Sequence, residues 1–514
     1  MKAGGGYVLI LLGLSLLFVL PVWGKWFSIG STEINLRDPL LVLNKSLGFM
    51  LLGLLLTGKS EALLSRFSKL GVPKNMLLWT SLFTLIFVSL SLFRYYAVSC
   101  NTYDFALFEN IFYHIAFLKD LHSFVNHRLH IFNGHLCPIF FVYALIYRLW
   151  GITGCIAVHK IALAMSIPLT YYLISTLENG NSQQGEAKGY AILLLSFAPA
   201  FFKLGVQDLY PEALVLPLGL ALLLSFYRKK WGFLLLSAVS ILLIREDTGI
   251  LLAAIFIYLR LKHNCKKCGQ MAVIVLLITA VLFYIQSIFA GPLPSKFAVR
   301  YGLRSFYDLK GFLHLLINVI KPLSIATFAF HCLGFGLLPF MEWKPALAAY
   351  MVAAPHLVSR YWRQKFLTGY YPIFEYPLLY LAVILSFLRL KNHNLKTHTV
   401  LALAFALLMG PRNITHRLDR DYILAANRAI SAIPPGVPVA ATFKLASRLG
   451  GRPILYVLVN SPHFQSPARA PFVLIEETDL FYRNWWQEAL RILKSKGYVE
   501  ILNEAGVHLL MLPQ

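Results

Sequence analysis

Acidic residues are scarce in this chain. Its 514 residues include 23 Asp and Glu against 47 Lys and Arg, and charged residues make up only 14% of the total. Soluble globular domains carry about 25% charged residues, so this content, beside 58% hydrophobic residues, excludes that class. The chain has six cysteines at scattered positions, and these give no disulfide framework.

Long apolar runs take the place of the missing charges. Segments of about 15 to 20 hydrophobic residues recur along the chain and predict a polytopic α-helical membrane protein with about 11 to 13 transmembrane helices. The net charge of +24 comes largely from Lys and Arg in short loops between these segments. Such loops indicate cytoplasmic positions and contact with anionic lipid, not nucleic acid. The first segment, residues 7–22, has no cleavage site after it and predicts a retained anchor.

The chain divides into three parts by composition. Residues 1–75 hold an additional pair of hydrophobic segments, residues 76–410 form the main transmembrane core, and residues 411–514 contain no spanning run. Helix-like and strand-like segments alternate in this last part, which predicts a small C-terminal α/β domain outside the membrane. The basic loop at residues 58–75 is expected in the cytoplasm, so residues 94–135 form the first large outer loop.

This outer loop gathers ionisable groups between two apolar segments. It contains Asp104, Glu109, Asp120 and five histidines, among them His135. A membrane protein does not usually gather so many ionisable groups between two apolar segments without a use for them, so we expect an active site on the extracytoplasmic face. A structural alternative stays open for Asp104, which could cap the N-terminus of an interfacial helix.

Counting the crossings brings further acids to the same face. From the outer loop to the basic cluster at residues 228–230 the chain must cross an odd number of times, yet four apolar segments lie between them. Residues 136–150 would reach only about 22 Å against a hydrocarbon core of about 30 Å, so we expect this segment not to span. This count places Asp208, Glu212, Glu246 and Asp247 outside. A plain turn is the alternative for Asp208 and Glu212, and a structural ion pair is the alternative for Glu246 and Asp247.

Four short motifs carry a family resemblance. They are Y-D-F-A-L-F-E at residues 103–109, H-L-C-P at 135–138, D-L-Y-P-E at 208–212 and R-E-D at 245–247. In order and spacing they resemble the F-D-L-G-I-F-D, H-F-S-P, D-F-H-P-E and K-E-D motifs of a large family of prokaryotic predicted membrane proteins of unknown function. That family resembles the GT-C glycosyltransferases, and the resemblance runs from about residue 76 to the end of the chain. Tyr210 departs from it, because the family has a histidine there.

The resemblance implies an enzyme. A GT-C-like protein would move a sugar from a polyprenyl-phosphate-linked donor to a glycan, lipid or protein acceptor outside the membrane, with Asp104 as the base. The departing phosphate would need a divalent cation, Mg²⁺ or Mn²⁺, or basic side chains. Asp104, Asp208 and His135 are the candidate metal ligands. The candidates for acceptor contacts or supporting roles are Glu109, His135, Asp208, Glu212, Glu246 and Asp247, and the candidates for phosphate binding are Lys296, Arg300, Arg304, Arg360 and Arg363.

Two other classes of function stay open. A transporter also places carboxylates within the membrane, but it should show internal repeats, and the sequence shows no convincing repeat. A non-catalytic membrane or envelope scaffold would use the C-terminal domain as its working part.

Overall fold

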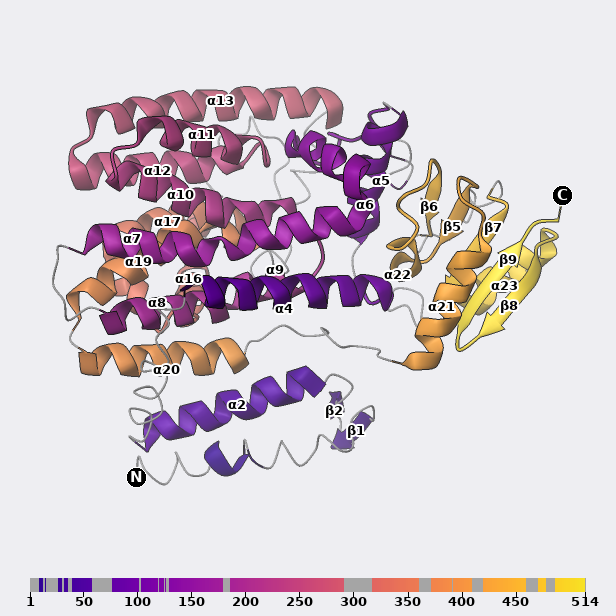
Figure 1. Ribbon diagram of the computed structural model, residues 1–514, viewed down its shortest axis with the longest axis horizontal. Helices are drawn as coiled ribbons and strands as arrows, with labels where there is room; N and C mark the ends of the chain where they lie inside the picture. Colours follow the sequence, from indigo (N-terminus) through magenta and orange to yellow (C-terminus); the bar gives the residue numbers. More distant parts are fainter. Residues whose placement is uncertain are drawn as a thin grey trace.

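A bundle of long helices makes up most of the molecule, and a small sheet lies beyond one of its ends, as the computed structural model shows (Figure 1). The C-terminus lies in this sheet domain, and the N-terminal segments lie along one side of the bundle. The structure describes residues 9–12, 14, 26–29, 32–35, 39–57, 76–100, 103–118, 120–123, 125, 129–178, 185–290, 317–359, 371–390, 392–408, 419–458, 470–477 and 486–513.

Apolar helices form the bundle, and they coincide with the hydrophobic segments predicted from residue 40 to residue 409. Three short 3-10 turns join them: η5 (Pro211–Leu214), η6 (Leu338–Met341) and η7 (Tyr371–Phe374). The helices are α2 (Pro39–Leu56), α4 (Met76–Tyr96), α6 (Ile139–Ala164), α7 (Ser166–Leu177), α8 (Gly185–Phe197), α9 (Pro199–Val206), α10 (Val215–Tyr227), α11 (Trp231–Leu242), α12 (Thr248–His263), α13 (Lys266–Ala290), α16 (Pro322–Leu333), α17 (Trp343–Leu357), α19 (Tyr376–Arg389) and α20 (Asn392–Leu408).

Length and composition identify the clearest membrane spans. Within the described residues, three stretches are long and apolar enough to cross a bilayer: Met76–Tyr96, Ile139–Leu177 and Lys266–Phe289. The bent pair α8 and α9 makes a fourth if it counts as one span. On α13 the exposed apolar side chains recur every three or four residues, as on a helix that faces lipid. They are Val273, Leu277, Val281, Tyr284 and Ile288. The total of 11 to 13 helices stays a prediction.

The chain reverses direction inside α6. Gly151 has φ +64° and ψ −165°, a conformation that glycine adopts readily and other residues avoid. Tyr143 Oη lies 2.6 Å from His159 Nδ1, although 16 residues of straight helix would separate them by about 24 Å. The first half of α6 therefore folds back against the second half. That residues 136–150 do not span the membrane stays a prediction.

The outer loop contains one short helix that is covered on two sides. α5 (Tyr103–Tyr113) continues into a π-helical turn, η2 (His114–Leu118), and two short strands follow, β3 (His122–Ser123) and β4 (Leu129–His130). Phe105, Ile111 and Phe112 pack against α6 in one apolar cluster, whereas Ala106 packs in a different cluster with the C-terminal domain. α5 therefore lies between the bundle and the sheet domain.

The C-terminal domain is the predicted α/β unit. Its sheet has the order β6-β5-β7-β9-β8, with β5 parallel to β6 and β7 and with β9 antiparallel to its two neighbours. The hairpin of β8 and β9 closes at Ala505 and Gly506, both at positive φ, as a two-residue turn requires. The elements are α21 (Arg420–Ala432), β5 (Val439–Ala441), α22 (Phe443–Ala446), β6 (Leu455–Val457), β7 (Phe472–Glu476), α23 (Trp486–Ser495), β8 (Val499–Glu504) and β9 (Val507–Met511).

Two smaller features were not predicted. β1 (Trp26–Ile29) and β2 (Thr32–Asn35) form an antiparallel pair before α2. Cys265 and Cys268 are bonded to each other in the turn between α12 and α13.

Candidate functional site

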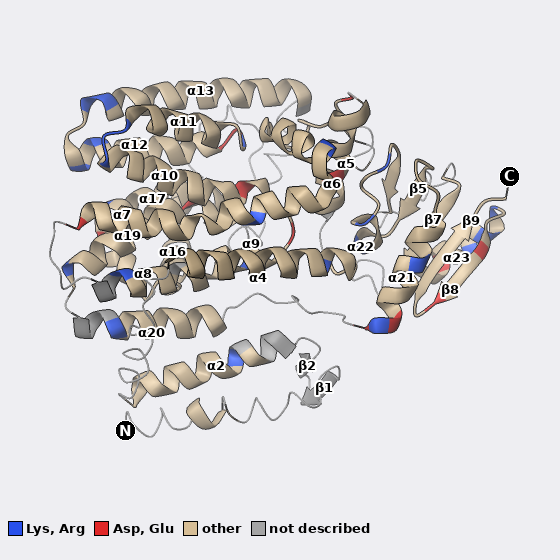
Figure 2. Ribbon diagram, viewed as in Figure 1, with Lys and Arg blue, Asp and Glu red and all other residues tan. Residues whose placement is uncertain are grey.

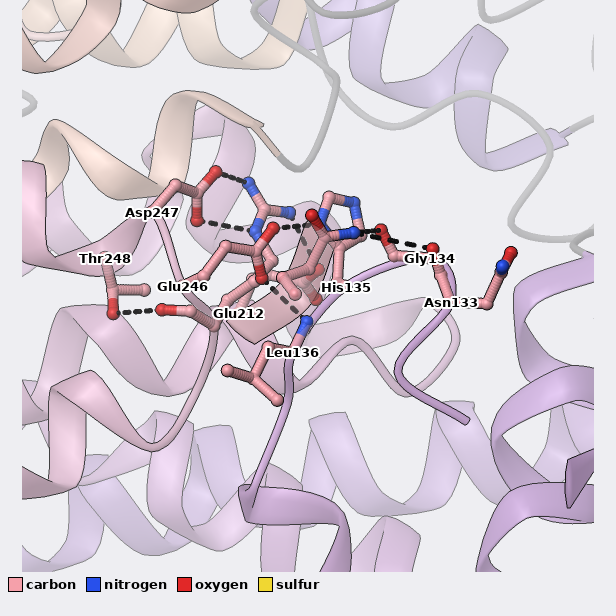
Figure 3. Close-up of polar contacts among 10 residues, drawn as sticks. Asn133, Gly134, His135, Leu136, Glu212, Glu246, Asp247 and Thr248 are labelled. Carbon is pink, nitrogen blue, oxygen red and sulfur yellow. Dashed lines mark hydrogen bonds and ion pairs between the residues drawn. The ribbon is translucent and has the colours of Figure 1, made fainter. Parts of the chain in front are cut away.

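Charged residues from distant parts of the sequence meet near the end of the bundle that carries α5. Asp208 follows α9, Glu212 lies in η5, and the R-E-D triplet at residues 245–247 links α11 to α12. His135 precedes α6. Figure 3 shows His135, Glu212, Glu246 and Asp247 side by side, with side chains that point toward one another. The structure therefore brings together carboxylates that lie up to 39 residues apart in the sequence, from Asp208 to Asp247. It adds His135, a histidine from the outer loop.

Arg245 is the cation at the centre of this group. Its Nη1 donates to Glu212 Oε1 at 3.1 Å, its Nε donates to Asp247 Oδ1 at 2.6 Å, and its Nη2 donates to the other Asp247 oxygen. The guanidinium is 1% exposed, and its carbon lies 4.7 Å from the centre of the Phe374 ring. Burial would raise the pKa of Asp247, but the charge and hydrogen bonds of Arg245 outweigh burial and lower that pKa to about 2.

Glu246 fixes the loop in front of α6. One of its oxygens, Oε1, lies 2.7 Å from His135 Nδ1, and the other, Oε2, accepts the backbone N–H of Leu136 at 2.8 Å. Gln286 on α13 adds two weaker bonds, from its Nε2 to the carbonyls of Asn133 and Gly134 (Figure 3). Both oxygens of Glu246 are thus engaged, so this carboxylate acts as a structural anchor that orients His135.

Asp208 has cationic neighbours of its own. Arg94, at the end of α4, places Nη2 3.7 Å from Asp208 Oδ1, and both side chains are buried. Lys160 on α6 donates to the carbonyls of Leu204 and Gln207 at 2.6 Å and to that of Asp208 at 3.1 Å. A cation at the C-terminal end of α9 is favourable because the last carbonyls of a helix carry partial negative charge. These contacts fix the position at which Asp208 enters the site.

Asp104 differs from the other carboxylates. It lies in the first turn of α5 and is partly exposed, and among the described residues its carboxylate makes no hydrogen bond or ion pair. Burial raises its pKa to about 6; the negative charges of Glu212 and Asp208 add to the increase, and His135 opposes it. A carboxylate whose pKa lies near neutral is suited to accept a proton.

Glu109 lies apart from this group, on the side of α5 that faces the C-terminal domain. It is 3% exposed, accepts a hydrogen bond from Tyr147 Oη at 3.3 Å, and lies against Gly450 and Gly451. Burial raises its pKa to about 8, although the charge of Arg448 and the bond from Tyr147 act in the opposite direction. Its contacts are those of an interface between domains and not those of the carboxylate cluster.

The predicted phosphate-binding residues fall outside the described residues: Lys296, Arg300, Arg304, Arg360 and Arg363. Sequence analysis assigned no role to Arg94 or Lys160, which are buried cations of the site, and it gave a structural ion pair as the alternative for the triplet that contains Arg245. A signal for Arg245 was present, since it opens the R-E-D triplet and interrupts an apolar run. Arg94 ends the apolar run of α4 and looked like an ordinary flanking residue.

Metal binding stays a prediction. Within the described part of the chain, no three His, Cys, Asp or Glu side chains are arranged to hold a cation. Of the candidates, Asp208 is near Arg94 and His135 is bonded to Glu246. Mg²⁺ and Mn²⁺ need oxygen ligands around the ion, which carboxylates supply.

The fold and the buried charges define a multi-spanning helical membrane protein with a carboxylate-rich site at one end of its bundle. The chain belongs to the family "Predicted membrane protein (DUF2079)", whose sequence pattern matches residues 94–495 and so includes all four motifs. No curated protein gives a significant match.

Two solved structures show a distant overall similarity to this chain. One is ArnT from Cupriavidus metallidurans bound to undecaprenyl phosphate, at 14% identity and a TM-score of 0.49. The other is the same protein in the apo state, at 13% identity and a TM-score of 0.48. Each alignment covers 85% of this chain and 98% of the other.

Proposed function

We propose that this protein is a GT-C-like membrane glycosyltransferase, which moves a sugar from a polyprenyl-phosphate-linked donor to an acceptor outside the membrane. The observation that carries the proposal is the contrast between Asp104 and its neighbours. Glu212, Glu246 and Asp247 are held by Arg245, His135 or backbone N–H groups, whereas the Asp104 carboxylate is unengaged among the described residues. The four motifs are those of a family that resembles the GT-C glycosyltransferases, and this resemblance supplies the type of reaction.

In the proposed reaction Asp104 takes the proton of the acceptor hydroxyl. The hydroxyl oxygen attacks the anomeric carbon of the donor sugar, the bond from that carbon to the phosphate oxygen breaks, and the polyprenyl phosphate leaves with the bonding electrons. A pKa of about 6 leaves Asp104 ionised at neutral pH but still basic enough to hold the proton in the transition state. The proposed phosphate partners are the basic residues of 296–304 and 360–363.

The distribution of Lys and Arg supports an outward-facing site. Figure 2 shows basic residues gathered where α12 meets α13, at the end of these helices away from the C-terminal domain. These are Arg260, Lys262, Lys266 and Lys267. Cytoplasmic loops carry the excess of basic residues, so we place this end in the cytoplasm and place α5, the carboxylates and the C-terminal domain outside.

The test is transfer by purified protein in nanodiscs. The substrates are short polyprenyl phosphates that carry radiolabelled glucose, mannose, galactose or arabinose, with membrane glycans and lipids as acceptors. Replacing Asp104 by Asn should lower the rate by about 10² to 10⁴, the usual contribution of a general base. The matched control is Asp120→Asn, because Asp120 lies in the same loop but pairs with exposed His122.

Two results would count against the proposal. Full activity of folded Asp104→Asn would remove this residue as the base. Movement of an intact labelled solute into liposomes, without cleavage of the sugar–phosphate bond, would favour a transporter. Repeating transfer with EDTA and with added Mg²⁺ or Mn²⁺ tests the expected cation separately.

A further inference from the structure

One buried amide joins α5 to the C-terminal domain. Asn110 is fully buried, and its Nδ2 donates to the carbonyls of Gly450 at 3.1 Å and Arg452 at 2.8 Å. Its Oδ1 accepts the hydroxyl of Ser123 at 2.9 Å. Both amide hydrogens and the amide oxygen are therefore used, and they connect three segments of the chain: α5, β3 and the loop that follows α22.

The loop after α22 lacks side chains where it meets α5. A Cβ atom on Gly450 would lie 2.6 Å from the Cβ of Glu109, and one on Gly451 would lie 2.6 Å from Tyr147 Oη. Contacts this short do not occur between carbon atoms in packed proteins, so any larger residue at Gly450 would push the loop and the helix apart. The glycines permit the approach that brings the loop carbonyls within reach of Asn110.

The same loop is anchored on both of its sides. The Arg452 guanidinium donates to the carbonyls of Pro434 at 2.7 Å and Ile433 at 3.2 Å, within its own domain. Toward the outer loop, His114 Nε2 lies 2.8 Å from the carbonyl oxygen of Pro453. The loop therefore transmits the position of the C-terminal domain directly to α5 and η2.

Apolar contacts extend this connection. Val98, Ala106 and Val125 of the outer loop are buried in the same cluster as residues of α21, α22, β5, β7 and β9. Arg448, next to the glycine pair, stacks over Tyr95 at 4.4 Å. The C-terminal domain is thus packed onto the outer loop by its own core, and it does not hang from the bundle by a linker alone.

Asn110 lies on the same short helix, α5, as Asp104, the proposed base. Asp104 precedes Asn110 by six residues, about 9 Å along a helix and about 240° around it. Asp104 therefore faces the carboxylate cluster while Asn110 faces the C-terminal domain. A misplacement of a reacting group by about 1 Å can reduce a rate by about 10², so the seating of α5 matters for catalysis.

We propose that Asn110 is a positioning residue, which sets the distance of Asp104 from Glu212 and Asp208 by clamping α5 against the loop at residues 448–453. The C-terminal domain is then a working part of the enzyme. This inference rests on the proposed role of Asp104 as the base.

The first test needs no substrate. Carbodiimide couples an amine to protonated carboxyl groups, so labelling of Asp104 against pH, read by peptide mass spectrometry, gives its titration midpoint. We expect a midpoint near pH 6 in the wild type and about one pH unit lower in Asn110→Ala and Gly450→Ala, because α5 moves away from the other carboxylates. Asn427→Ala is the matched control, since Asn427 joins the same domain to the end of α4 through the Tyr96 carbonyl and does not touch α5.

The second test is transfer. We expect kcat to fall about 10- to 100-fold in Asn110→Ala. The KM for the donor should stay within twofold, because donor binding does not depend on the position of α5. If Asn110→Ala does not give a monodisperse protein, Gly450→Ala and Ser123→Ala carry the same comparison.

The outcomes separate the two proposals. An unshifted midpoint and an unchanged kcat in the folded variants would refute the clamp and leave the glycosyltransferase proposal intact. A shifted midpoint in a protein whose wild type cleaves no lipid-linked sugar would keep the clamp and refute the proposed function.

Discussion

Protonation of Glu109 should control how firmly the C-terminal domain binds the outer loop. Its carboxyl group is buried between α5, Tyr147 and the two glycines of the 448–453 loop, and its Oε2 accepts no hydrogen bond from the described residues. The titratable or charged groups around it, among the described residues, are Tyr95, Tyr147, Cys155 and Arg448, and of these only Arg448 carries a charge at neutral pH. Burial outweighs that charge, so the neutral acid is the form that fits the contact.

The sign and size follow from the pKa. Burial raises the pKa of Glu109 from 4.5 to about 8 in the closed contact, and the group returns toward 4.5 when the contact opens. The contact is therefore strongest below pH 4.5 and weakens as the pH rises through 8, because opening then releases a proton. Between pH 6 and pH 8 the closed state should lose about 2 kcal/mol, roughly a 50-fold change in the opening equilibrium.

Hydrogen exchange of the loop measures this equilibrium. Amides of residues 443–458 are followed at pH 6 and pH 8, and rates are normalised to an unstructured peptide. Wild-type protection should fall by roughly 50-fold over this interval. Glu109→Gln should remove the pH dependence of protection, because an amide does not titrate in this range. Its oxygen can still accept the hydrogen bond from Tyr147, so the contact itself is kept. Glu488→Gln, an exposed acid on α23, is the control. Equal pH dependence in wild type and Glu109→Gln would show that another group is responsible.

Three further predictions concern the bundle. Arg245→Met leaves buried Glu212 and partly exposed Asp247 without their cation and should cost about 3 to 5 kcal/mol of stability, measured by thermal unfolding in detergent; neutralising both partners in the same chain should restore most of it. Glu212→Gln removes a negative charge near Asp104, so the acid limb of the kcat/KM profile, expected near pH 6, should move to lower pH; an unmoved limb would assign it to another group. Gly205→Ala places a methyl group within 2.5 Å of three atoms of the Phe87 ring and should cost about 1 to 3 kcal/mol, with recovery in Phe87→Leu.

Chemistry and spacing in the sequence were enough to predict the elements and the gathering of the acids. Hydrophobic runs located the bundle helices, because membrane helices must be apolar over most of their length. Short strand-like runs that alternate with helix-like segments located the strands of the C-terminal sheet. The sequence did not indicate the reversal of the chain at Gly151.

Partners in space could not be predicted in the same way. The contact of Asn110 with Gly450 joins residues 340 positions apart, and neither residue type signals a partner. The sequence placed Glu109 with the catalytic candidates because it shares a motif with Asp104. On a helix, however, residues five positions apart point in clearly different directions, and this rotation turns Glu109 toward the C-terminal domain.

Ion pairing explains how so few acids can make a selective site. Several carboxylates confined in one buried space repel one another, and without cations most would bind protons. Arg245 prevents this for Asp247, whose pKa it lowers to about 2, and it also donates to Glu212. Asp104 lacks a cation of its own among the described residues; burial raises its pKa most, and the negative charges of Glu212 and Asp208 add to the increase. Arg245 thus supports the proposed base without touching it, because it holds in place Glu212, whose charge helps to raise the pKa of Asp104.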